Sequence, residues 1–337
     1  MAIDHSKIKK ILVISLTNIG DIILTFPVID ILREAFPASE LSVVVGPKGE
    51  SLLRGNPHIK NVYLFDKRQS VQHVIRWIQE LRKQTFDLIV DLRNSAIPFF
   101  LNSRYKTSPF LRRGTRHMRW QHLQRLKSIY PYVAEAKDRY ALYVSPPDRQ
   151  YVEEILKKEM GDRQKFVVIG PGAADQKKRW TEEGFAAVSD WIIQKHRLPV
   201  VFVGDEADKK VTQNVIRKMT QPAIDLAGKI TLAQLACLLQ RCVFAIVNDS
   251  APLHMASYWN VPVLALFGPT NPNRYGPWSL HNCVIRRQEN CSACTVGDER
   301  SAHTCMQAIA AKDILDAFEI KSDGVAFQRE FHFEDMG

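Results

Sequence analysis

Short apolar runs alternate with helical spacings along the chain, and residues 243–278 show this pattern most clearly. Residues 243–247 and 262–267 are apolar, too short for a helix, and end at small, polar or Gly and Pro residues, which is typical of buried parallel strands. Residues 250–259 between them have the apolar spacing of a helix packed on a sheet. The loop 248–251 is therefore predicted at the carboxyl end of a strand and the start of a helix. Backbone N–H groups and the helix dipole favour an anionic ligand there.

The same alternation predicts two doubly wound α/β domains. In the first half, strands are expected at residues 9–16, 41–45, 62–65 and 86–92, with helices at 22–35 and 71–81. In the second half, strands are expected at 166–170, 199–204, 223–226, 243–247 and 262–267, with helices at 151–160, 181–196, 209–219, 232–240 and 250–259. The run 145–148, Ser-Pro-Pro-Asp, interrupts the pattern. We therefore expect one domain over 1–150, a second over 151–312, and a closing helix with a polar tail over 313–337.

Composition places the chain among soluble globular proteins. Its 337 residues are 45% hydrophobic and 24% charged, which excludes disordered, collagen-like and membrane-spanning classes. Residues 1–10 are polar and the next apolar run, 11–16, is too short for a secretory signal, so a cytoplasmic location is expected. The net charge of +10 indicates an acidic partner, either nucleic acid, anionic lipid headgroups or a phosphorylated substrate. Charge alone does not choose among them.

Much of this positive charge falls in one stretch. No acidic residue occurs between Asp91 and Glu135. The basic residues of the stretch are Arg93, Arg104, Lys106, Arg112, Arg113, Arg116, Arg119, Arg125 and Lys127. With Tyr105, Phe110 and Trp120 interleaved, they suit either single-stranded nucleic acid or the acidic sugars and lipid phosphates of a membrane surface.

Asp21 is a candidate general base. It follows Gly20 just after the first predicted strand, where a carboxylate near a helix N-terminus can take a proton from an attacking hydroxyl. The alternative is that Asp21 only caps the helix, because Asp is a preferred capping residue. One role does not exclude the other.

The loop after the strand at 166–170 is a candidate phosphate site. Gly170 and Gly172 followed by the Thr181 helix can cradle a diphosphate, and a nearby lysine of the loop, which contains Lys177 and Lys178, can supply the compensating charge. The alternative is an ordinary connection with solvated lysines. Neither a GxGxxG fingerprint nor a Walker motif follows a strand, which argues against NAD and P-loop functions. Asp249 and His254 lie five positions apart. Asp249 suits a sugar hydroxyl and His254 a phosphate or a sugar oxygen, although a helix His more often fills a core contact.

A zinc-like pair of cysteines lies near the C-terminus. Cys291 and Cys294 have the CxxC spacing, and His303 and Cys305 follow. A second CxxC is missing, and His303 and Cys305 are only two positions apart, so this spacing argues against zinc. We expect no metal ligand here, and the six irregularly spaced cysteines do not indicate a disulfide framework.

Five motifs together carry a resemblance to a known family. In chain order they are Thr17-Asn18-Ile19-Gly20-Asp21, the loop 170–180 with Lys178-Arg179-Trp180, Gly228-Lys229-Ile230-Thr231-Leu232, Asp249-Ser250-Ala251-Pro252-Leu253-His254 and Phe267-Gly268-Pro269-Thr270-Asn271-Pro272. The set spans nearly the whole chain and resembles the heptosyltransferases of glycosyltransferase family nine. That family adds heptose from ADP-heptose to the inner core of lipopolysaccharide. The resemblance implies the GT-B architecture, with two Rossmann-like domains facing across a cleft, acceptor on the N-terminal one and nucleotide-sugar on the C-terminal one.

The resemblance also implies roles for single residues. It makes Asp21 the general base and Lys178 the partner of the donor diphosphate in an inverting, metal-independent transfer without a cofactor. The implied donor-binding residues are Thr17, Asn18, Gly20, Gly172, Ala173, Ala174, Glu206, Ile230, Thr231, Asp249, Ser250, Ala251 and His254. Asp205 or Asp208 can replace Glu206 as the ribose ligand. Ala173 and Ala174 stand where relatives often offer hydroxyls, so only their backbone amides are left to bind phosphate.

The basic stretch gains a specific interpretation from the resemblance. An acidic lipopolysaccharide core acceptor at the inner membrane surface would bind Arg93, Arg112, Arg113, Arg116 and Arg119. A cytoplasmic protein, peripheral on the cytoplasmic face of that membrane and binding no nucleic acid, is then expected. The alternatives are a GT-B transferase or epimerase that uses a UDP-sugar, and a non-catalytic module that binds nucleotide or RNA.

Overall fold

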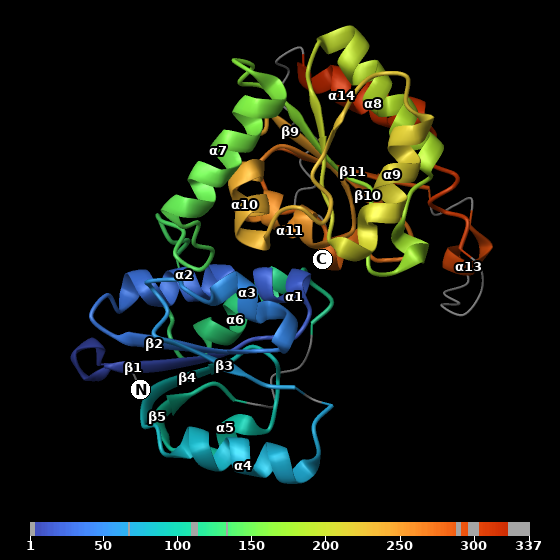
Figure 1. Ribbon diagram of the computed structural model, residues 1–337. Coiled ribbons are helices and arrows are strands. Elements are labelled where there is room, and N and C mark those ends of the chain that lie inside the picture. The colour runs from blue at the N-terminus through green and yellow to red at the C-terminus, as the bar shows by residue number, and fades with distance from the viewer. Residues whose placement is uncertain are drawn as a thin grey trace. The chain divides into compact units, whose positions relative to one another are not determined.

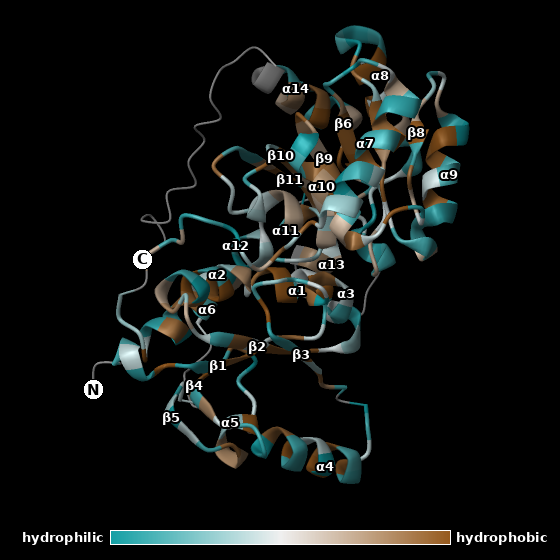
Figure 2. Cartoon of the chain, turned by 60° about the vertical axis from the view of Figure 1, so that its left-hand side comes forward, coloured by the Kyte–Doolittle hydropathy of each residue, from teal (hydrophilic) through white to brown (hydrophobic). Residues whose placement is uncertain are grey.

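The computed structural model describes residues 4–66, 68–108, 114–132, 134–287, 291–295 and 303–322, without the side chains of 295 and 320–322. The chain forms two compact units, residues 1–145 and 146–337 (Figure 1). Each contains a parallel sheet with helices on both faces, so the predicted α/β class is confirmed. Figure 2 shows hydrophobic residues concentrated on the strands, which are therefore buried between the helical layers.

The sheet of the first unit is parallel throughout, with the order β3-β2-β1-β4-β5 in the described residues. Its strands are β1 Lys10–Ile14, β2 Glu40–Val45, β3 Asn61–Leu64, β4 Phe86–Asp91 and β5 Ser103–Lys106. The sequence predicts the first four because they are apolar runs. The polar edge strand β5 was not predicted.

Helices cover both faces of this sheet. Figures 1 and 2 show α4 and α5 on one face and α1, α2, α3 and α6 on the other. Their bounds are α1 Ile19–Ile23, α2 Phe26–Ala35, α3 Glu50–Leu53, α4 Val71–Arg82, α5 Ile97–Phe100 and α6 Met118–Lys127. The helix α4 has apolar residues at helical spacing, and of these only Leu81 near its end is fully buried. Leu81 is 2% exposed, whereas Val71 and Ile75 are 75% and 50% exposed.

The second unit has a parallel sheet with the order β11-β10-β9-β6-β7-β8 in the described residues. Its strands are β6 Val167–Gly170, β7 Val200–Phe202, β8 Ile224–Asp225, β9 Phe244–Asn248, β10 Val263–Phe267 and β11 Asn282–Arg286. Its helices are α7 Pro146–Met160, α8 Glu182–His196, α9 Lys209–Lys218, α10 Leu232–Arg241, α11 Ala251–Tyr258, α12 Pro272–Tyr275, α13 Ser292–Thr295 and α14 Ala311–Ser322. Figure 1 shows α8, α9 and α14 on one face and α7, α10 and α11 on the other.

Two helices differ from the prediction because of proline. The helix expected at 22–35 is divided into α1 and α2, and Pro27 lies in the first turn of α2, where its missing N–H breaks no hydrogen bond. Pro146 and Pro147 likewise lie in the first turn of α7, so the helix expected at 151–160 begins at Pro146. The predicted cap of α8 is confirmed, since the Thr181 side chain accepts a hydrogen bond from the N–H of Gly184.

Candidate active site

The strand order of the second unit locates a ligand site. From β6 the chain moves to β7 and β8 on one side, and β9 to β11 lie on the other, so the order reverses between the neighbouring strands β6 and β9. Ligands of open α/β sheets bind at the carboxyl ends of the strands beside such a switch point. Both loops proposed for the donor, 170–180 and 248–251, follow these two strands.

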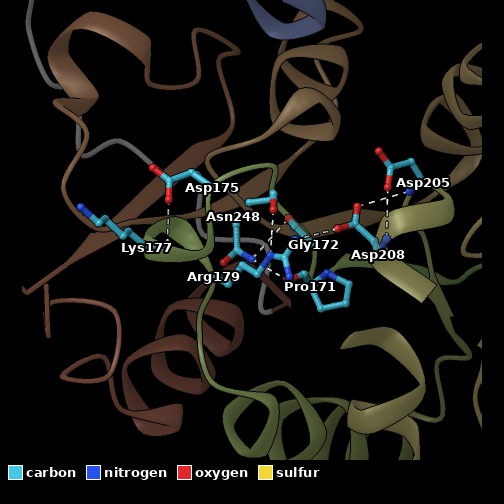
Figure 3. Close-up of polar contacts among 9 residues, drawn as sticks. Pro171, Gly172, Asp175, Lys177, Arg179, Asp205, Asp208 and Asn248 are labelled. Carbon is cyan, nitrogen blue, oxygen red and sulfur yellow. Dashed lines mark hydrogen bonds and ion pairs between the residues drawn. The ribbon is translucent and has the colours of Figure 1, made fainter. Parts of the chain in front are cut away.

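Asn248, the last residue of β9, holds the loop after β6 in place. Its side chain is fully buried, and its Nδ2 donates to the carbonyl oxygen of Pro171 at 2.8 Å. Its Oδ1 accepts from the N–H of Trp180 at 3.2 Å, and Trp180 Nε1 donates to the carbonyl of Ile309 at 3.0 Å. One amide thus fixes both ends of the loop, as Figure 3 shows at Pro171. The sequence places Asn248 in the predicted ligand loop but predicts no role for its side chain. The feature of the sequence that could have identified it is a polar residue at the end of an otherwise apolar strand.

Lys178 and Asp249 meet at the switch point. Lys178 Nζ lies 2.7 Å from Asp249 Oδ2, and the two side chains are 30% and 5% exposed. A lysine ammonium has three N–H donors, so it can hold Asp249 and a second anionic oxygen together. Lys177 next to it is exposed and extends away from the Pro171–Gly172 turn in Figure 3. The structure therefore singles out Lys178 from the basic residues of the loop.

Asp208 and Arg179 form a second network, which packs against Gly172 and Ala173. A methyl group at Gly172 would overlap the carboxylate of Asp208, so only glycine fits between the loop and η4 (Glu206–Asp208). Arg179 Nε donates to the carbonyl of Ala173 at 2.8 Å, and its guanidinium lies 3.5 Å from Asp208 Oδ1. Burial, with a further contribution from the charge of Asp205, raises the pKa of Asp208. Through its contacts with Gly172 and Arg179, Asp208 supports the loop. The sequence alone did not predict this role for Asp208 or for Arg179.

The residues expected around the nucleoside lie near one another. Glu206 pairs with Lys209 at 2.7 Å on the exposed turn after β7. Gly228 has a φ of +65° and lies so close to Glu206 that a methyl group there would be 2.9 Å from Glu206 Oε2. The segment then leads through half-buried Ile230 to Thr231, which caps α10 and whose hydroxyl oxygen accepts from the N–H of Gln234 at 3.2 Å.

The start of α11 carries the remaining expected donor residues. Ser250 is its N-cap and donates from Oγ to the carbonyl of Asn248 at 3.2 Å, and Ala251 is its first residue. His254, 5% exposed, stacks on Trp278 at 6.0 Å between ring centroids. On the facing loop, Ala173 is buried and Ala174 is exposed.

The first unit has a corresponding switch point between β1 and β4. Asp21 lies half-buried in the first turn of α1 and accepts a hydrogen bond from Asn18 Nδ2 at 3.1 Å. A methyl group at Gly46, after β2, would lie 2.8 Å from Thr17, so the loops after β1 and β2 pack closely. Gly20 is beside Asp21 in the same turn. The amide of Asn18 orients the candidate base at the edge where ligands bind.

Arg93 follows β4 at the same edge. Its guanidinium lies 4.7 Å from the centre of the Phe65 ring, and burial lowers its pKa. Its backbone N–H donates to Asp91 Oδ1 at 2.9 Å, and Asn94 turns the chain with a φ of +63°. Arg93 is therefore held in place by its own loop beside the switch point.

The described part of the remaining basic stretch does not form one solvated surface. Arg125 is buried and donates to the carbonyl of Asp91 at 2.8 Å, and Arg119 pairs with Glu135. Arg116 is exposed and lies 4.5 Å from the centre of the Trp120 ring. Arg112 and Arg113 lie outside the described residues.

Comparison with known proteins decides the family. The family model described as glycosyltransferase family 9 (heptosyltransferase) matches residues 74–304. The chain belongs to glycosyltransferase family 9. It is 24% identical over 306 residues to the lipopolysaccharide core heptosyltransferase OpsX of Haemophilus influenzae, covering 84% of this chain and 86% of that protein.

Solved structures of family 9 proteins have the same fold. The family 9 glycosyltransferase of Veillonella parvula superposes with a TM-score of 0.77 at 26% identity, over 92% of this chain and 96% of that one. ADP-heptose lipopolysaccharide heptosyltransferase II of E. coli gives a TM-score of 0.73 at 19% identity, over 93% and 99% of the two chains. The predicted family, GT-B fold and glycosyltransferase class are confirmed. The alternative of a non-catalytic module is therefore set aside.

A cluster of three cysteines and one histidine lies near the C-terminus of the second unit. Cys291, Cys294, His303 and Cys305 come together, with their ligand atoms within 4.8 Å of one another. The long sequence gap before His303 does not separate the four side chains. Among the described residues, no helix is long and apolar enough to cross a bilayer.

Proposed function

We propose that this family 9 enzyme transfers heptose from ADP-heptose to a hydroxyl group of an acidic lipopolysaccharide core acceptor, with inversion at the anomeric carbon. The names of its relatives support this donor and this class of acceptor. The observation that carries the proposal is the Lys178–Asp249 pair at the β6/β9 switch point, because it places an ammonium group where a diphosphate would bind.

In this mechanism the second unit binds the leaving group. Lys178 donates to the diphosphate while Asp249 keeps its ammonium in place and accepts from a sugar hydroxyl. Backbone N–H groups of Gly172, Ala173 and Ala251 add hydrogen bonds, which favour the charge that grows on the departing phosphate. The bond between the anomeric carbon and the phosphate oxygen breaks, and ADP leaves with the bonding electrons.

The first unit supplies the base. Asp21, oriented by Asn18, takes the proton of the acceptor hydroxyl as its oxygen forms the new bond to the anomeric carbon. Arg93 and Arg116 bind acidic groups of the acceptor. Lysine and backbone dipoles neutralise the diphosphate in this scheme, so the transfer step requires no metal ion. The enzyme would work at the cytoplasmic face of the membrane that carries this acceptor.

The base is tested by Asp21→Asn. The amide is isosteric and still accepts from Asn18, but it cannot take a proton. A positioned general base contributes about 10²–10⁴-fold, so kcat should fall by at least about a hundredfold while ADP binds as before. Rates come from mass spectrometric detection of the glycosylated acceptor, and ADP binding from calorimetry. Asp138→Asn, at an exposed carboxylate of the same unit, is the control. Near-normal turnover of the Asp21 variant would refute the assignment.

The donor site is tested by Lys178→Ala. Loss of the ammonium should weaken ADP binding by roughly tenfold or more, because a charge-assisted hydrogen bond of about 1.5–3 kcal/mol is lost. This variant also leaves the nearly buried Asp249 carboxylate without its cation, which can itself destabilise the site. The double variant Lys178→Ala/Asp249→Asn removes this buried charge, so that it measures the loss of the ammonium group alone. Lys177→Ala is the matched control. If the double variant and the control bound ADP equally well, Lys178 would have no role at the diphosphate.

The nucleotide is tested by competition. ADP should displace a bound nucleotide-sugar at lower concentration than UDP does, and sugar should be transferred from ADP-heptose. Transfer from a UDP-sugar with preferred binding of UDP would support the alternative transferase or epimerase and overturn the proposed donor.

A further inference from the structure

Three thiols and one imidazole converge at the end of the second unit. Cys291 directly precedes α13 and Cys294 lies within it, and His303 and Cys305 lie between α13 and α14. Cys294 Sγ is 3.1 Å from His303 Nδ1 and 3.6 Å from Cys305 Sγ, and Cys291 Sγ is 3.8 Å from His303 Nδ1. All four ligand atoms lie within 4.8 Å of one another.

These separations are close to those of a tetrahedral metal site. With Zn–S bonds of about 2.3 Å and a Zn–N bond of about 2.0 Å, a regular tetrahedron places two sulfurs about 3.8 Å apart and sulfur and nitrogen about 3.5 Å apart. No disulfide joins the three cysteines, so a disulfide does not explain their approach.

Apolar packing does not explain the cluster either. Cys291 and Cys305 are 1% and 0% exposed, and among the described residues the small apolar cluster around them adds only Ala293 and half-buried Cys294. The backbone N–H of Thr304 also points to Cys291 Sγ at 3.4 Å. Such N–H groups support thiolate ligands in the surroundings of a metal.

We propose that Cys291, Cys294, His303 and Cys305 bind one zinc ion. Three thiolates and one imidazole fill all four positions of a tetrahedral site, which makes the site structural and leaves no position for substrate. Thiolate ligands select zinc over the harder cations magnesium, calcium and manganese. The site is separate from the transfer step, so the proposal does not depend on the proposed function.

The metal would brace the turn that follows β10. A methyl group at Gly268 would lie 3.2 Å from Cys305 Sγ and 2.8 Å from Met306 Cγ, so the cluster packs directly against the start of this turn. Met306 is 1% exposed and belongs to the main core of the unit. Zinc would thus fasten α13 and the segment before α14 to the end of the sheet.

Metal analysis of the purified full chain tests the site. After purification under reducing conditions without metal affinity resin, mass spectrometry should find close to one zinc per chain. Cys294→Ser should lose most of it, whereas Cys283→Ser, at a cysteine in β11 outside the cluster, should retain it. Equal zinc in the two variants would overturn the proposal. Iron in place of zinc in the wild-type protein would overturn the assignment of the metal.

A second measurement works on the wild-type protein and does not depend on the folding of variants. A chelator should lower the thermal unfolding midpoint, and added zinc should restore it, because metal-binding energy is folding energy. Cobalt added to the stripped protein should give thiolate-to-cobalt charge-transfer bands and the visible absorption of tetrahedral cobalt. Absence of these bands with the thiols shown to be reduced would contradict the site.

Discussion

Burial keeps the side chain of His122 uncharged in the folded protein. It lies in α6, is 2% exposed, and neither ring nitrogen has a hydrogen-bond partner among the described residues. Burial, together with the nearby charges of Arg125 and His117, lowers its pKa from 6.5 to about 3. The folded protein therefore keeps this imidazole neutral at pH values where the unfolded chain would protonate it.

This difference predicts the pH dependence of stability. Below about pH 6.5 the unfolded chain binds a proton that folded His122 does not, so the free energy of unfolding falls as the pH falls, by about 1.4 kcal/mol per pH unit. The slope continues down to about pH 3, where the folded imidazole is protonated. His122→Leu should remove this slope. Urea unfolding of the wild-type and variant proteins between about pH 7 and pH 5 measures it.

His73→Leu, at an exposed histidine of α4 in the same unit, is the control and should leave the slope unchanged. Parallel pH profiles for wild-type and His122→Leu proteins would mean that His122 takes up its proton as readily in the folded state as in the unfolded chain. That result would contradict the lowered pKa.

At the scale of elements, the sequence predicts what local patterns encode. Apolar runs locate β1 to β4 and β6 to β10. Most of these strands are buried on both faces, whereas the edge strands β3 and β8 are only partly buried. β5 has alternating exposed residues at the sheet edge, and no run marks it. α6 was missed because its buried residues include His122 and Arg125, and Arg125 is buried with its guanidinium donating to the carbonyl of the distant residue Asp91. Such burial follows from tertiary structure and has no local pattern.

The same limit applies to the site. Lys178 and Asp249 are each identifiable from loops at strand ends and from the resemblance to the family. Their ion pair joins residues 71 positions apart, which only the neighbouring placement of β6 and β9 brings together. Asn248 and Arg179 bind backbone carbonyls, and any residue type can offer that acceptor. Supporting residues of this kind are therefore recognised only in the folded chain.

For the whole molecule, the net charge of +10 overstates what the basic stretch offers to a partner. Arg125 is buried and donates to a backbone carbonyl inside the first unit, and Arg119 pairs with Glu135, whereas Lys106 stays exposed while its Nζ donates to the carbonyl of Pro98. Arg116 is exposed and stacked on partly exposed Trp120, so it presents both charge and an aromatic surface. Among the described arginines expected at the acceptor, we therefore expect Arg116 to contribute most to attraction over a distance.

Reversing this charge tests whether position or only net charge matters. Arg116→Glu and Arg217→Glu change the net charge equally, and Arg217 is an exposed residue of α9 in the second unit. A basic residue near an anionic surface contributes about 1 kcal/mol, so reversal at Arg116 should raise the KM for a vesicle-embedded lipopolysaccharide acceptor roughly tenfold. Reversal at Arg217 should raise the KM much less, and kcat should change little in either variant.

Because screening acts over about 8 Å at physiological ionic strength, the difference in KM between the two variants should shrink as salt is added. Equal KM values for the two variants at low salt would show that the acceptor responds to overall charge and does not bind at Arg116.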